Sequence, residues 1–584
     1  MPLNRRDFVQ AMLGSSMALT LSFTQSRKTS AEVESVGDVS IPEIIAGEDL
    51  FFYINRMRGT FDPVLYRKLL GAANEFKEGD QMIGVAAADQ SSRLHARSLL
   101  ANTRIKEINA HPVYQDQLND YITPEQTVTT SSTVETVGDL KQFLLTENEA
   151  AIKQLSQSLS SDVIGCVVKL MSQQELITVG SKIFNPLPNS QIGAKGYLGA
   201  RIQPNSPTDN PDDIFWQVLD GWSYAVGDVV LGTNPVSSEP ESVAAIELVL
   251  RDLLVTFGIE QVLPHCVLSH IDVQAKVERR SPGSTALWFQ SIAGSDAANQ
   301  TFDIDLKKMR DYARSRTGQY GLYFETGQGA DFTNGHSHGF DMVLHESRKY
   351  GFARALTREV ANAQQASGQE SAPWVHLNDV AGFIGPEVFR TREQLVRCCL
   401  EDIVMGKLHG LTIGLDVCST LHMDVSLDDL DWCLDQIMPA NPAYLMALPT
   451  KIDPMLGYLT TGFQDHVRIF QKLNVIDDQG KPAENFGNPL HVYLQYRRKK
   501  GDTRGEEEIL NEGGRQMNEV RSRGLFLAEG FGKTQRELAP ALKVQIDQIY
   551  DDAKQSIWAE LTPAFVASVP EVLPVETNSS DRLE

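Results

Sequence analysis

Hydrophobic residues recur along this chain in two different patterns. From about residue 45 to residue 190, apolar positions are three or four residues apart and are interrupted by Gly and Asp, as in the stretch 62–108. This spacing is typical of amphipathic helices. From about residue 195, short apolar runs end in polar or turn residues and are followed by segments of helix length. The pattern predicts a mainly helical N-terminal region over 32–194 and alternating strands and helices after it.

Eight apolar runs of strand length follow one another in the second part of the chain. They cover residues 196–205, 228–236, 264–271, 285–294, 321–329, 373–385, 411–418 and 443–450. Eight strands, each followed by a helix, predict a closed (β/α)8 barrel over 195–484. The competing interpretation is an open doubly wound sheet. That fold would need fewer strands and a phosphate-binding glycine turn, and the sequence contains neither GxGxxG nor a P-loop.

The first 31 residues differ from the rest of the chain. "LNRRDFVQ" is followed by the uncharged run 11–23, which is too short to span a bilayer as a helix. A basic start, a short apolar core and small residues near Ala31 predict a signal peptide over 1–31. Arg5 and Arg6, with Phe8 two places on, resemble the twin-arginine type, so we expect export to the periplasm. The alternative is an uncleaved N-terminal helix on a cytoplasmic protein.

The last hundred residues, 485–584, form another distinct region. Residues 495–516 are strongly charged and predict a solvated linker. Residues 539–561 have helical periodicity, and the acidic end over 574–584 is typical of disorder.

Charge and cysteine content exclude some classes of function. The formal net charge of −23 argues against nucleic acid or an anionic membrane surface as a partner. No CxxC pair or metal-type spacing with histidine occurs among the cysteines, so we expect buried free thiols at Cys166, Cys266, Cys398, Cys399, Cys418 and Cys433.

Polar residues at the ends of the predicted strands are the candidate site. In a barrel of this kind, chemistry occurs at the carboxyl ends of the strands. The polar residues there are Arg201, Gln203, Asn234, Gln290, Ser291, Glu325 and Asp416, with Val380, Phe383 and Met446 as apolar neighbours. One cation, two carboxylates and three amides in an apolar wall suit a small cationic substrate. Glu325, with Gln203 and Asn234, would bind an ammonium group, and Arg201 with Asp416 would bind a hydroxyl. Alternatively, each side chain only hydrogen-bonds a neighbouring loop.

A catalytic metal is a further alternative. His336 and His338 form an HxH motif after the fifth predicted strand, and other histidines occur at positions 270, 376, 409 and 422. Metal-dependent barrel hydrolases would carry the HxH motif at the end of the first strand, where this chain has the sequence RIQ. We therefore expect no metal in the site.

Several long blocks resemble one known family. These blocks are "EGDQMIGVAAADQSSRLHARSLL" (78–100), "ARIQPN", "GDVVLGTNPV", "FQSIAGSD", "GLYFETGQG", "GFIGPE", "EDIVMGKLHGL", "IGLDVC" and "PMLGYLTTGFQD" (454–465). In this order they resemble the large (heavy) subunit of ethanolamine ammonia-lyase, an adenosylcobalamin-dependent radical enzyme with a (β/α)8 barrel. The resemblance implies deamination of ethanolamine to acetaldehyde and ammonia.

The resemblance also implies roles for individual residues. It assigns substrate contacts to Arg201, Gln203, Asn234, Glu325, Asp416, Val380, Phe383 and Met446, with Arg201, Glu325 and Asp416 as catalytic residues. It assigns cofactor contacts to Pro235, Gln290, Ser291, Thr333 and Met455. No DxHxxG stretch of the cobalamin-binding type occurs. The corrinoid is therefore expected between the barrel mouth and a separate small subunit, with several large subunits in a hetero-oligomer.

Two departures from the family and two alternatives remain. Thr333 stands where the family usually has serine, which keeps the hydroxyl group. The export-like N-terminus and the residues after 485 have no counterpart in the shorter bacterial subunits. The alternatives are an exported amine-binding barrel without turnover and a lyase for a related vicinal amino alcohol, since one methyl group changes binding by only about 1–3 kcal/mol.

Overall fold

The computed structural model describes most of the chain between residues 38 and 516. The described residues are 38–124, 134–224, 226–369, 372–382, 389–420, 423–453, 455, 457–473, 493–494, 497–498 and 500–516. The predicted signal peptide, the predicted helix over 539–561 and the acidic C-terminal end lie outside these residues, as do Phe383 and His422.

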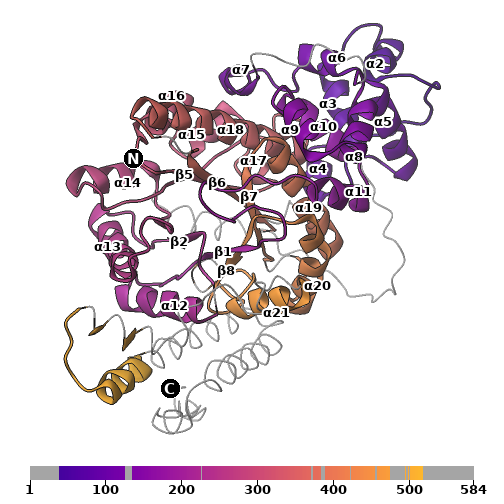
Figure 1. Ribbon diagram of the computed structural model, residues 1–584. Coiled ribbons are helices and arrows are strands. Elements are labelled where there is room, and N and C mark those ends of the chain that lie inside the picture. Colours follow the sequence, from indigo (N-terminus) through magenta and orange to yellow (C-terminus); the bar gives the residue numbers. More distant parts are fainter. Residues whose placement is uncertain are drawn as a thin grey trace, which may run out of the picture.

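Helices form the N-terminal region and lie together beside the barrel (Figure 1). Side-chain caps define several of their first turns: Asp89 accepts a hydrogen bond from Ser92 N at the start of one helix, and Thr136 and Asp139 form a capping box at the start of another. These helices confirm the predicted helical region. They are α2 (Leu50–Arg58), α3 (Pro63–Ala72), α4 (Glu78–Met82), α5 (Gln90–Asn102), α6 (Ile105–Ala110), α7 (Gln117–Ile122), α8 (Val137–Thr146), α9 (Glu149–Ser156), α10 (Ser161–Lys169) and α11 (Gln173–Gly180).

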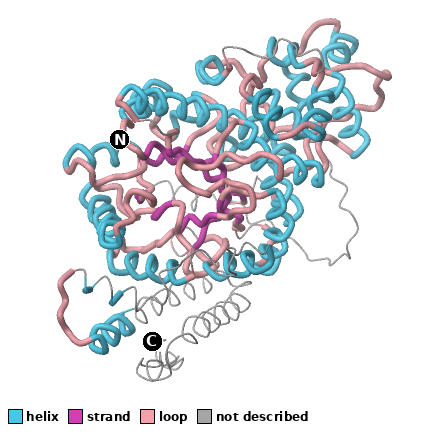
Figure 2. Tube along the Cα trace, in the orientation of Figure 1, coloured by secondary structure: helices cyan, strands magenta, loops and turns pink. Residues whose placement is uncertain are grey.

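Eight parallel strands form the central sheet, and helices surround it (Figure 2). Each predicted apolar run contains one strand, although β5 begins one residue before its run. The strands are β1 (Gly199–Ile202), β2 (Val230–Thr233), β3 (His265–Val267), β4 (Trp288–Ser291), β5 (Tyr320–Thr326), β6 (Trp374–Ala381), β7 (Thr412–Val417) and β8 (Tyr444–Ala447). Their order around the sheet is β3-β2-β1-β8-β7-β6-β5-β4. The predicted (β/α)8 barrel is confirmed.

The barrel closes between β3 and β4. At this seam the backbone N–H of Leu287 donates to the carbonyl of His265 at 3.2 Å. Inside the barrel, Gly414 on β7 leaves room for the ring of Tyr444 on β8, because a Cβ at this glycine would overlap that ring. Large side chains can therefore fill the interior below the carboxyl ends of the strands.

The helices that follow the strands cover the outside of the barrel. They are α12 (Pro211–Ser223), α13 (Pro240–Phe257), α14 (Ile271–Arg280), α15 (Asp296–Thr301), α16 (Leu306–Ser315), α17 (Ala330–Thr333), α18 (Met342–Ala366), α19 (Arg392–Leu408), α20 (Leu427–Ile437), the short 3-10 helix η1 (Met438–Ala440) and α21 (Phe463–Leu473). Helices α18 and α19 are buried along most of their length, because the N-terminal helices pack against their outer side.

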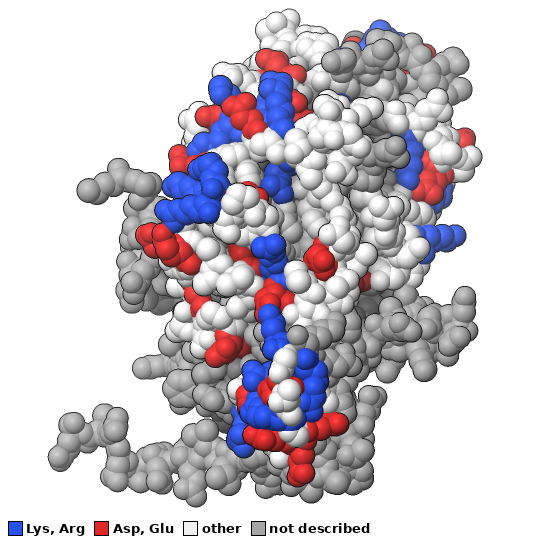
Figure 3. Space-filling view, turned by 60° about the vertical axis from the view of Figure 1, so that its left-hand side comes forward, with Lys and Arg blue, Asp and Glu red and all other residues white. Residues whose placement is uncertain are grey.

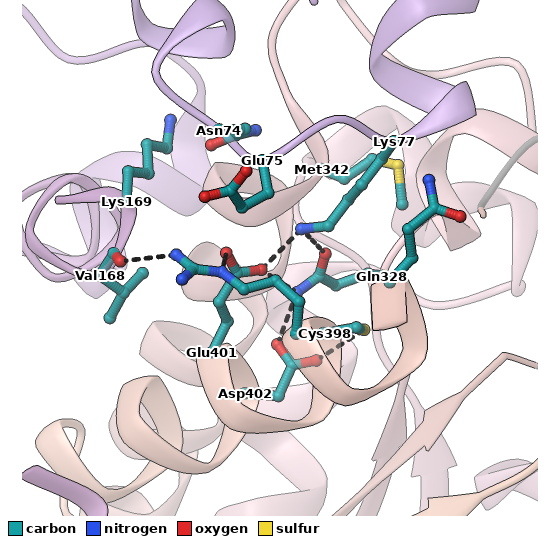
Figure 4. A network of polar contacts seen from close by, with 12 residues as sticks. Asn74, Glu75, Lys77, Val168, Lys169, Gln328, Met342, Cys398, Glu401 and Asp402 are labelled. Atoms are coloured by element: carbon teal, nitrogen blue, oxygen red, sulfur yellow. Dashed lines mark hydrogen bonds and ion pairs between the residues drawn. The ribbon is translucent and has the colours of Figure 1, made fainter. Parts of the chain in front are cut away.

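A buried charge network joins the N-terminal region to the barrel (Figure 4). The Lys77 ammonium donates to Glu401 Oε2 at 2.6 Å and to Gln328 Oε1 at 2.9 Å. The other Glu401 oxygen accepts from Arg397 Nε at 2.7 Å. The two terminal nitrogens of Arg397 donate to backbone carbonyls of the N-terminal region. Each of these charged groups therefore has partners within the protein.

Two further carboxyl groups lie next to this network. Asp402 accepts from Gln328 Nε2 at 3.0 Å and from the Cys398 thiol at 3.1 Å. Asp379, on the outward side of β6, lies close to both Cys398 and Asp402, and its two oxygens have no hydrogen-bond donor among the described residues. Burial raises the pKa of Asp379, and it raises the pKa of Asp402 to about 7.

The described part of the C-terminal region packs on the outside of the barrel. Tyr493 lies against Trp216 of α12 with ring centroids 4.6 Å apart, and Ile509 and Leu510 are buried in the same apolar cluster. The stretch 495–516, predicted as a solvated linker, is thus packed in part, and residues 506–516 are helical.

The six cysteines are free and buried, as predicted. On the face shown in Figure 3, acidic and basic side chains lie side by side. None of the helices that the structure describes is long and apolar enough to cross a membrane.

Candidate active site

The strand ends bring the predicted polar residues to one mouth of the barrel. Arg201 lies on β1 in register with Met446 on β8, and Asp416 on β7 is in register with Val380 on β6. On the other side of the barrel, Glu325 on β5 is in register with Ser291 on β4. Inward-facing side chains at the carboxyl ends of strands point into a common space.

Arg201 occupies the centre of this arrangement. Its side chain is fully buried, with the guanidinium carbon 5.4 Å from the centre of the Tyr323 ring. Nη1 donates to Gln203 Oε1 and approaches Met446 Sδ at 3.0 Å, while Nη2 lies 3.3 Å from Glu325 Oε1. Neither Nε nor Nη2 has a hydrogen-bond partner among the described residues. A buried guanidinium with two unused donors can bind a polar ligand.

Glu325 is positioned by a hydrogen bond from an aromatic residue. The Tyr323 hydroxyl, two residues earlier on the same face of β5, donates to Glu325 Oε1 at 2.6 Å. The Tyr323 ring is stacked on His376 with centroids 4.5 Å apart. Burial lowers the pKa of His376 to about 3, so this imidazole is neutral at pH 7. The Glu325 side chain keeps 16% of its surface exposed, so its carboxylate remains accessible from the mouth.

Asp416 is a fully buried acid of the site. Thr460 donates to its Oδ1, but Oδ2 has no donor among the described residues. Burial raises the pKa of the Asp416 carboxyl to about 7, while hydrogen bonds from Thr460 and Tyr458 and the charge of Arg201 act in the opposite direction. Near neutral pH this group can therefore accept a hydrogen bond as a carboxylate or donate one as an acid.

One of the predicted amides, that of Gln203, is fixed by an acid that sequence reasoning did not identify. Asp453 Oδ2 accepts from Gln203 Nε2 at 2.8 Å and from Asn205 Nδ2 at 2.6 Å. Asn205 Oδ1 in turn accepts from the backbone N–H of Asn234 at 3.1 Å. The ends of β1 and β2 are thereby connected to the loop after β8, which carries Met455.

The predicted cofactor contacts lie around the same end of the barrel. Ser291, Thr333 and Met455 are half-buried, and Pro235 is buried. Gln290 differs, because its amide is used within the protein: Oε1 accepts from Ile271 N at 3.1 Å, and Nε2 donates to the Ser291 carbonyl at 3.1 Å. Of the predicted apolar neighbours, Val380 and Met446 are buried at the mouth. Phe383 lies outside the described residues.

Of the described histidines, His336 and His338 of the HxH motif lie near each other, with ring centroids 5.7 Å apart. His338 is stacked on Tyr114 with centroids 4.3 Å apart, and its Nε2 is 3.1 Å from Ser295 Oγ. His270 Nε2 is 2.9 Å from the Phe302 carbonyl. The two groups of potential metal ligands found among the described residues are His270–Asp272–Asp303 and Asp379–Cys398–Asp402, and neither contains a predicted site residue.

Strand periodicity could have identified one of the residues that sequence reasoning missed. Tyr323 is two positions before Glu325 and so shares its face of the strand. Asp453, Tyr458 and Thr460 follow β8 in a loop without periodicity, and only their proximity to Met455 pointed to the site. All of these residues act on predicted site residues: they donate to or accept from Glu325, Asp416 or Gln203.

The fold and the site together define a (β/α)8-barrel protein with a buried, charged site at the carboxyl ends of its strands. A family model, that of the ethanolamine ammonia lyase large subunit (EutB), matches residues 61–491. The ethanolamine ammonia-lyase large subunit of Escherichia coli K12 is 32% identical to this chain over 428 residues, which cover 70% of this chain and 89% of that protein. The large subunit of Salmonella typhimurium LT2 matches to the same extent. This chain belongs to the ethanolamine ammonia-lyase large-subunit family.

Proposed function

We propose that this chain, with a small subunit, catalyses the deamination of ethanolamine to acetaldehyde and ammonia, using adenosylcobalamin. Family membership supports the reaction class. The observation that carries the proposal is the set of unsatisfied buried atoms at the mouth: Arg201 Nη2 and Asp416 Oδ2, close to the accessible Glu325 carboxylate. Buried polar atoms without partners are rare in native proteins and indicate a missing ligand or water.

Ethanolamine has the functional groups that this set needs. Its hydroxyl group can accept a hydrogen bond from Arg201 Nη2 and donate one to Asp416 Oδ2. Its ammonium group carries three donors and one positive charge, which complement the Glu325 carboxylate and the Gln203 and Asn234 side chains. Hydrogen bonds to charged groups contribute about 1.5–3 kcal/mol each, so loss of either end of the substrate weakens binding strongly.

The residues then act on the substrate through position and charge. Arg201 and Asp416 hold the hydroxyl-bearing carbon in one orientation, and Asp416 can hold or release a proton at Oδ2 because its pKa is about 7. Glu325 stabilises the positive charge on the amine as its bond to carbon breaks. Val380 and Met446 form an apolar wall that excludes water.

The residues at the mouth also fit the proposed cofactor. Ser291 and Thr333 offer hydroxyl groups, and Pro235 and Met455 offer apolar surface, which suits a broad ring bearing amide side chains. Gln290 fits this role less directly, because its amide orients Ser291 and the start of α14. When bound, adenosylcobalamin supplies the carbon-centred radical that removes hydrogen from the substrate. The small subunit would cover the cofactor from the side away from the barrel.

Ammonia release by the reconstituted complex tests the proposal. We expect no ammonia from the chain alone, and turnover of ethanolamine when adenosylcobalamin and the small subunit from the same organism are both added. Omission of either component is the control. Turnover by the isolated chain, or turnover that does not depend on adenosylcobalamin, would contradict the proposal. Binding of ethanolamine without any ammonia release by the full complex would favour an amine-binding protein instead.

A further inference from the structure

One carboxylate oxygen controls the orientation of two amides at the amine end of the site. Asp453 Oδ2 accepts from both Gln203 Nε2 and Asn205 Nδ2, at 2.8 and 2.6 Å. Its other oxygen accepts from the backbone N–H of Met455 at 2.8 Å. Asp453 and Gln203 are fully buried, and Asn205 is 3% exposed. Three N–H groups therefore point at the two oxygens of this buried carboxyl group, and hydrogen-bond donors of this kind favour a carboxylate over the neutral acid.

Gln203 lies between a group that can only accept and a group that can only donate. An ionised carboxylate has no hydrogen to donate, and a guanidinium has no lone pair to offer. Gln203 must therefore turn its NH2 toward Asp453 and its oxygen toward Arg201, as the structure shows. A rotated amide would place oxygen against oxygen at one end and NH2 against the guanidinium at the other. The orientation of this amide is thus fixed by its two charged neighbours.

We propose that Asp453 is a positioning residue that makes Gln203 a hydrogen-bond acceptor for the substrate ammonium group. An amide oxygen has two lone pairs, and Arg201 uses one of them. The contact with Arg201 also fixes the direction of the second lone pair, which can accept a hydrogen bond from a ligand group that only donates. Without the Asp453 charge, Gln203 could present its NH2 group instead and repel the ammonium. This inference rests on the proposed function, because it assigns Gln203 to the amine end of ethanolamine.

Two single substitutions and their combination test this role. Asp453→Asn removes the charge that orients the amide, so we expect ethanolamine affinity to fall about 10- to 100-fold. Gln203→Glu should lower ethanolamine affinity by a similar factor, because two carboxylates would then face each other. In the double variant, the carboxylate at position 203 needs no orientation and the amide at position 453 can donate to it. Asn205 Nδ2 loses its acceptor in this variant, so we expect partial recovery, with ethanolamine affinity at least about threefold higher than in either single variant.

The readout is calorimetric binding to the complex of this chain with its small subunit, and kcat/KM with the cofactor added. Ethylene glycol, which has hydroxyl groups and no ammonium, serves as a second ligand, and Asp453→Asn should change its affinity less than about threefold. Asp465→Asn is the matched control. Asp465 is also buried after β8, where it accepts from Gly462 N and pairs with Lys451. This control should lower the melting temperature and leave ethanolamine affinity unchanged.

Each outcome supports or overturns the inference. Recovery in the double variant, with an effect restricted to the amine-bearing ligand, supports it. Equal losses for both ligands, or no recovery in the double variant, would show that Asp453 only ties the loop to the barrel and would overturn it while the proposed function stands. If the wild-type complex binds no ethanolamine, the proposed function is wrong, and this inference is wrong with it.

Discussion

Two regions of this molecule bury charged side chains, and they differ in how those charges are satisfied. In the buried charge network between the N-terminal helices and the barrel, Glu401 has a cation on each oxygen, and Lys77 and Arg397 direct their other donors at protein acceptors. At the barrel mouth, Arg201 Nη2 has only an ion pair with Glu325, and Arg201 Nε, Arg201 Nη2 and Asp416 Oδ2 have no hydrogen-bond partner among the described residues. Lys77, Glu401, Arg201 and Asp416 are all fully buried, whereas Glu325 at the mouth is partly exposed.

The difference separates a structural role from a binding role. Burying a charged group costs several kcal/mol of solvation free energy. The folded protein offsets this cost only where other groups of the protein pair with the charge. The buried charge network has such partners, so removing one of its charges should lower the free energy of unfolding. The barrel mouth lacks some of these partners, so a ligand must supply the missing hydrogen bonds. Two glutamates, Glu401 in the network and Glu325 at the mouth, allow this contrast to be tested with the same substitution.

The largest effect is expected for Glu401→Gln. The substitution keeps the shape of the side chain but leaves Lys77 and Arg397 without a countercharge in a fully buried position. Leaving buried charges unpaired typically costs 3–5 kcal/mol, so we expect the free energy of unfolding in urea to fall by about that amount. Asp311→Asn is the control: it removes the countercharge of Lys307 in an exposed pair and should leave the free energy of unfolding nearly unchanged. Equal effects for the two variants would contradict this interpretation of the network.

Glu325→Gln should have the opposite profile. Loss of the carboxylate charge facing the substrate ammonium should lower kcat/KM by about 30- to 1000-fold, equivalent to about 2–4 kcal/mol. The unfolding free energy should change by less than about 1 kcal/mol, because Arg201 keeps its contacts with Gln203 and the Tyr323 ring and Glu325 is partly exposed. Steady-state kinetics and urea denaturation of one purified variant measure both quantities. A large loss of stability with kcat/KM within a few-fold of wild type would make Glu325 a structural partner of Arg201.

The smallest expected effect is the change of kcat/KM with pH. The pKa of Asp416 is raised by burial to about 7, and the proposed role requires its carboxylate to accept from the substrate hydroxyl. We therefore expect kcat/KM to rise about tenfold between pH 6 and a plateau above about pH 8, and we expect no such rise in the residual activity of Asp416→Asn.

Stability should move in the opposite direction over the same pH range. The folded state binds the Asp416 proton more tightly than the unfolded state, so its contribution to stability is fully present below pH 4 and is lost as pH rises through about 7. Urea denaturation at several pH values measures this slope, and Asp416→Asn should reduce it. A kcat/KM that falls between pH 6 and pH 8 would show that Asp416 acts as a proton donor.

The barrel and most of its mouth could be predicted because both follow from strand periodicity. Each strand had a run of apolar residues, and Arg201, Glu325 and Asp416 are inward-facing polar residues near the ends of such runs. The buried charge network could not be predicted in this way. Lys77 precedes "EGDQ", which by composition is typical of a solvated turn. Nothing in the local sequence shows that its ammonium is buried against Glu401, because burial there depends on packing between distant segments.

The separation of Lys77 and Glu401 has a consequence for biosynthesis. The two residues are 324 positions apart in the chain. A ribosome adds about 5–20 residues per second, so roughly 15–65 seconds pass after Lys77 is made before its partner exists. During this time the N-terminal helices have an unpaired ammonium on the surface that will become their interface. The ammonium is hydrated until then, and docking of the N-terminal helices on the barrel must wait until α19 has left the ribosome.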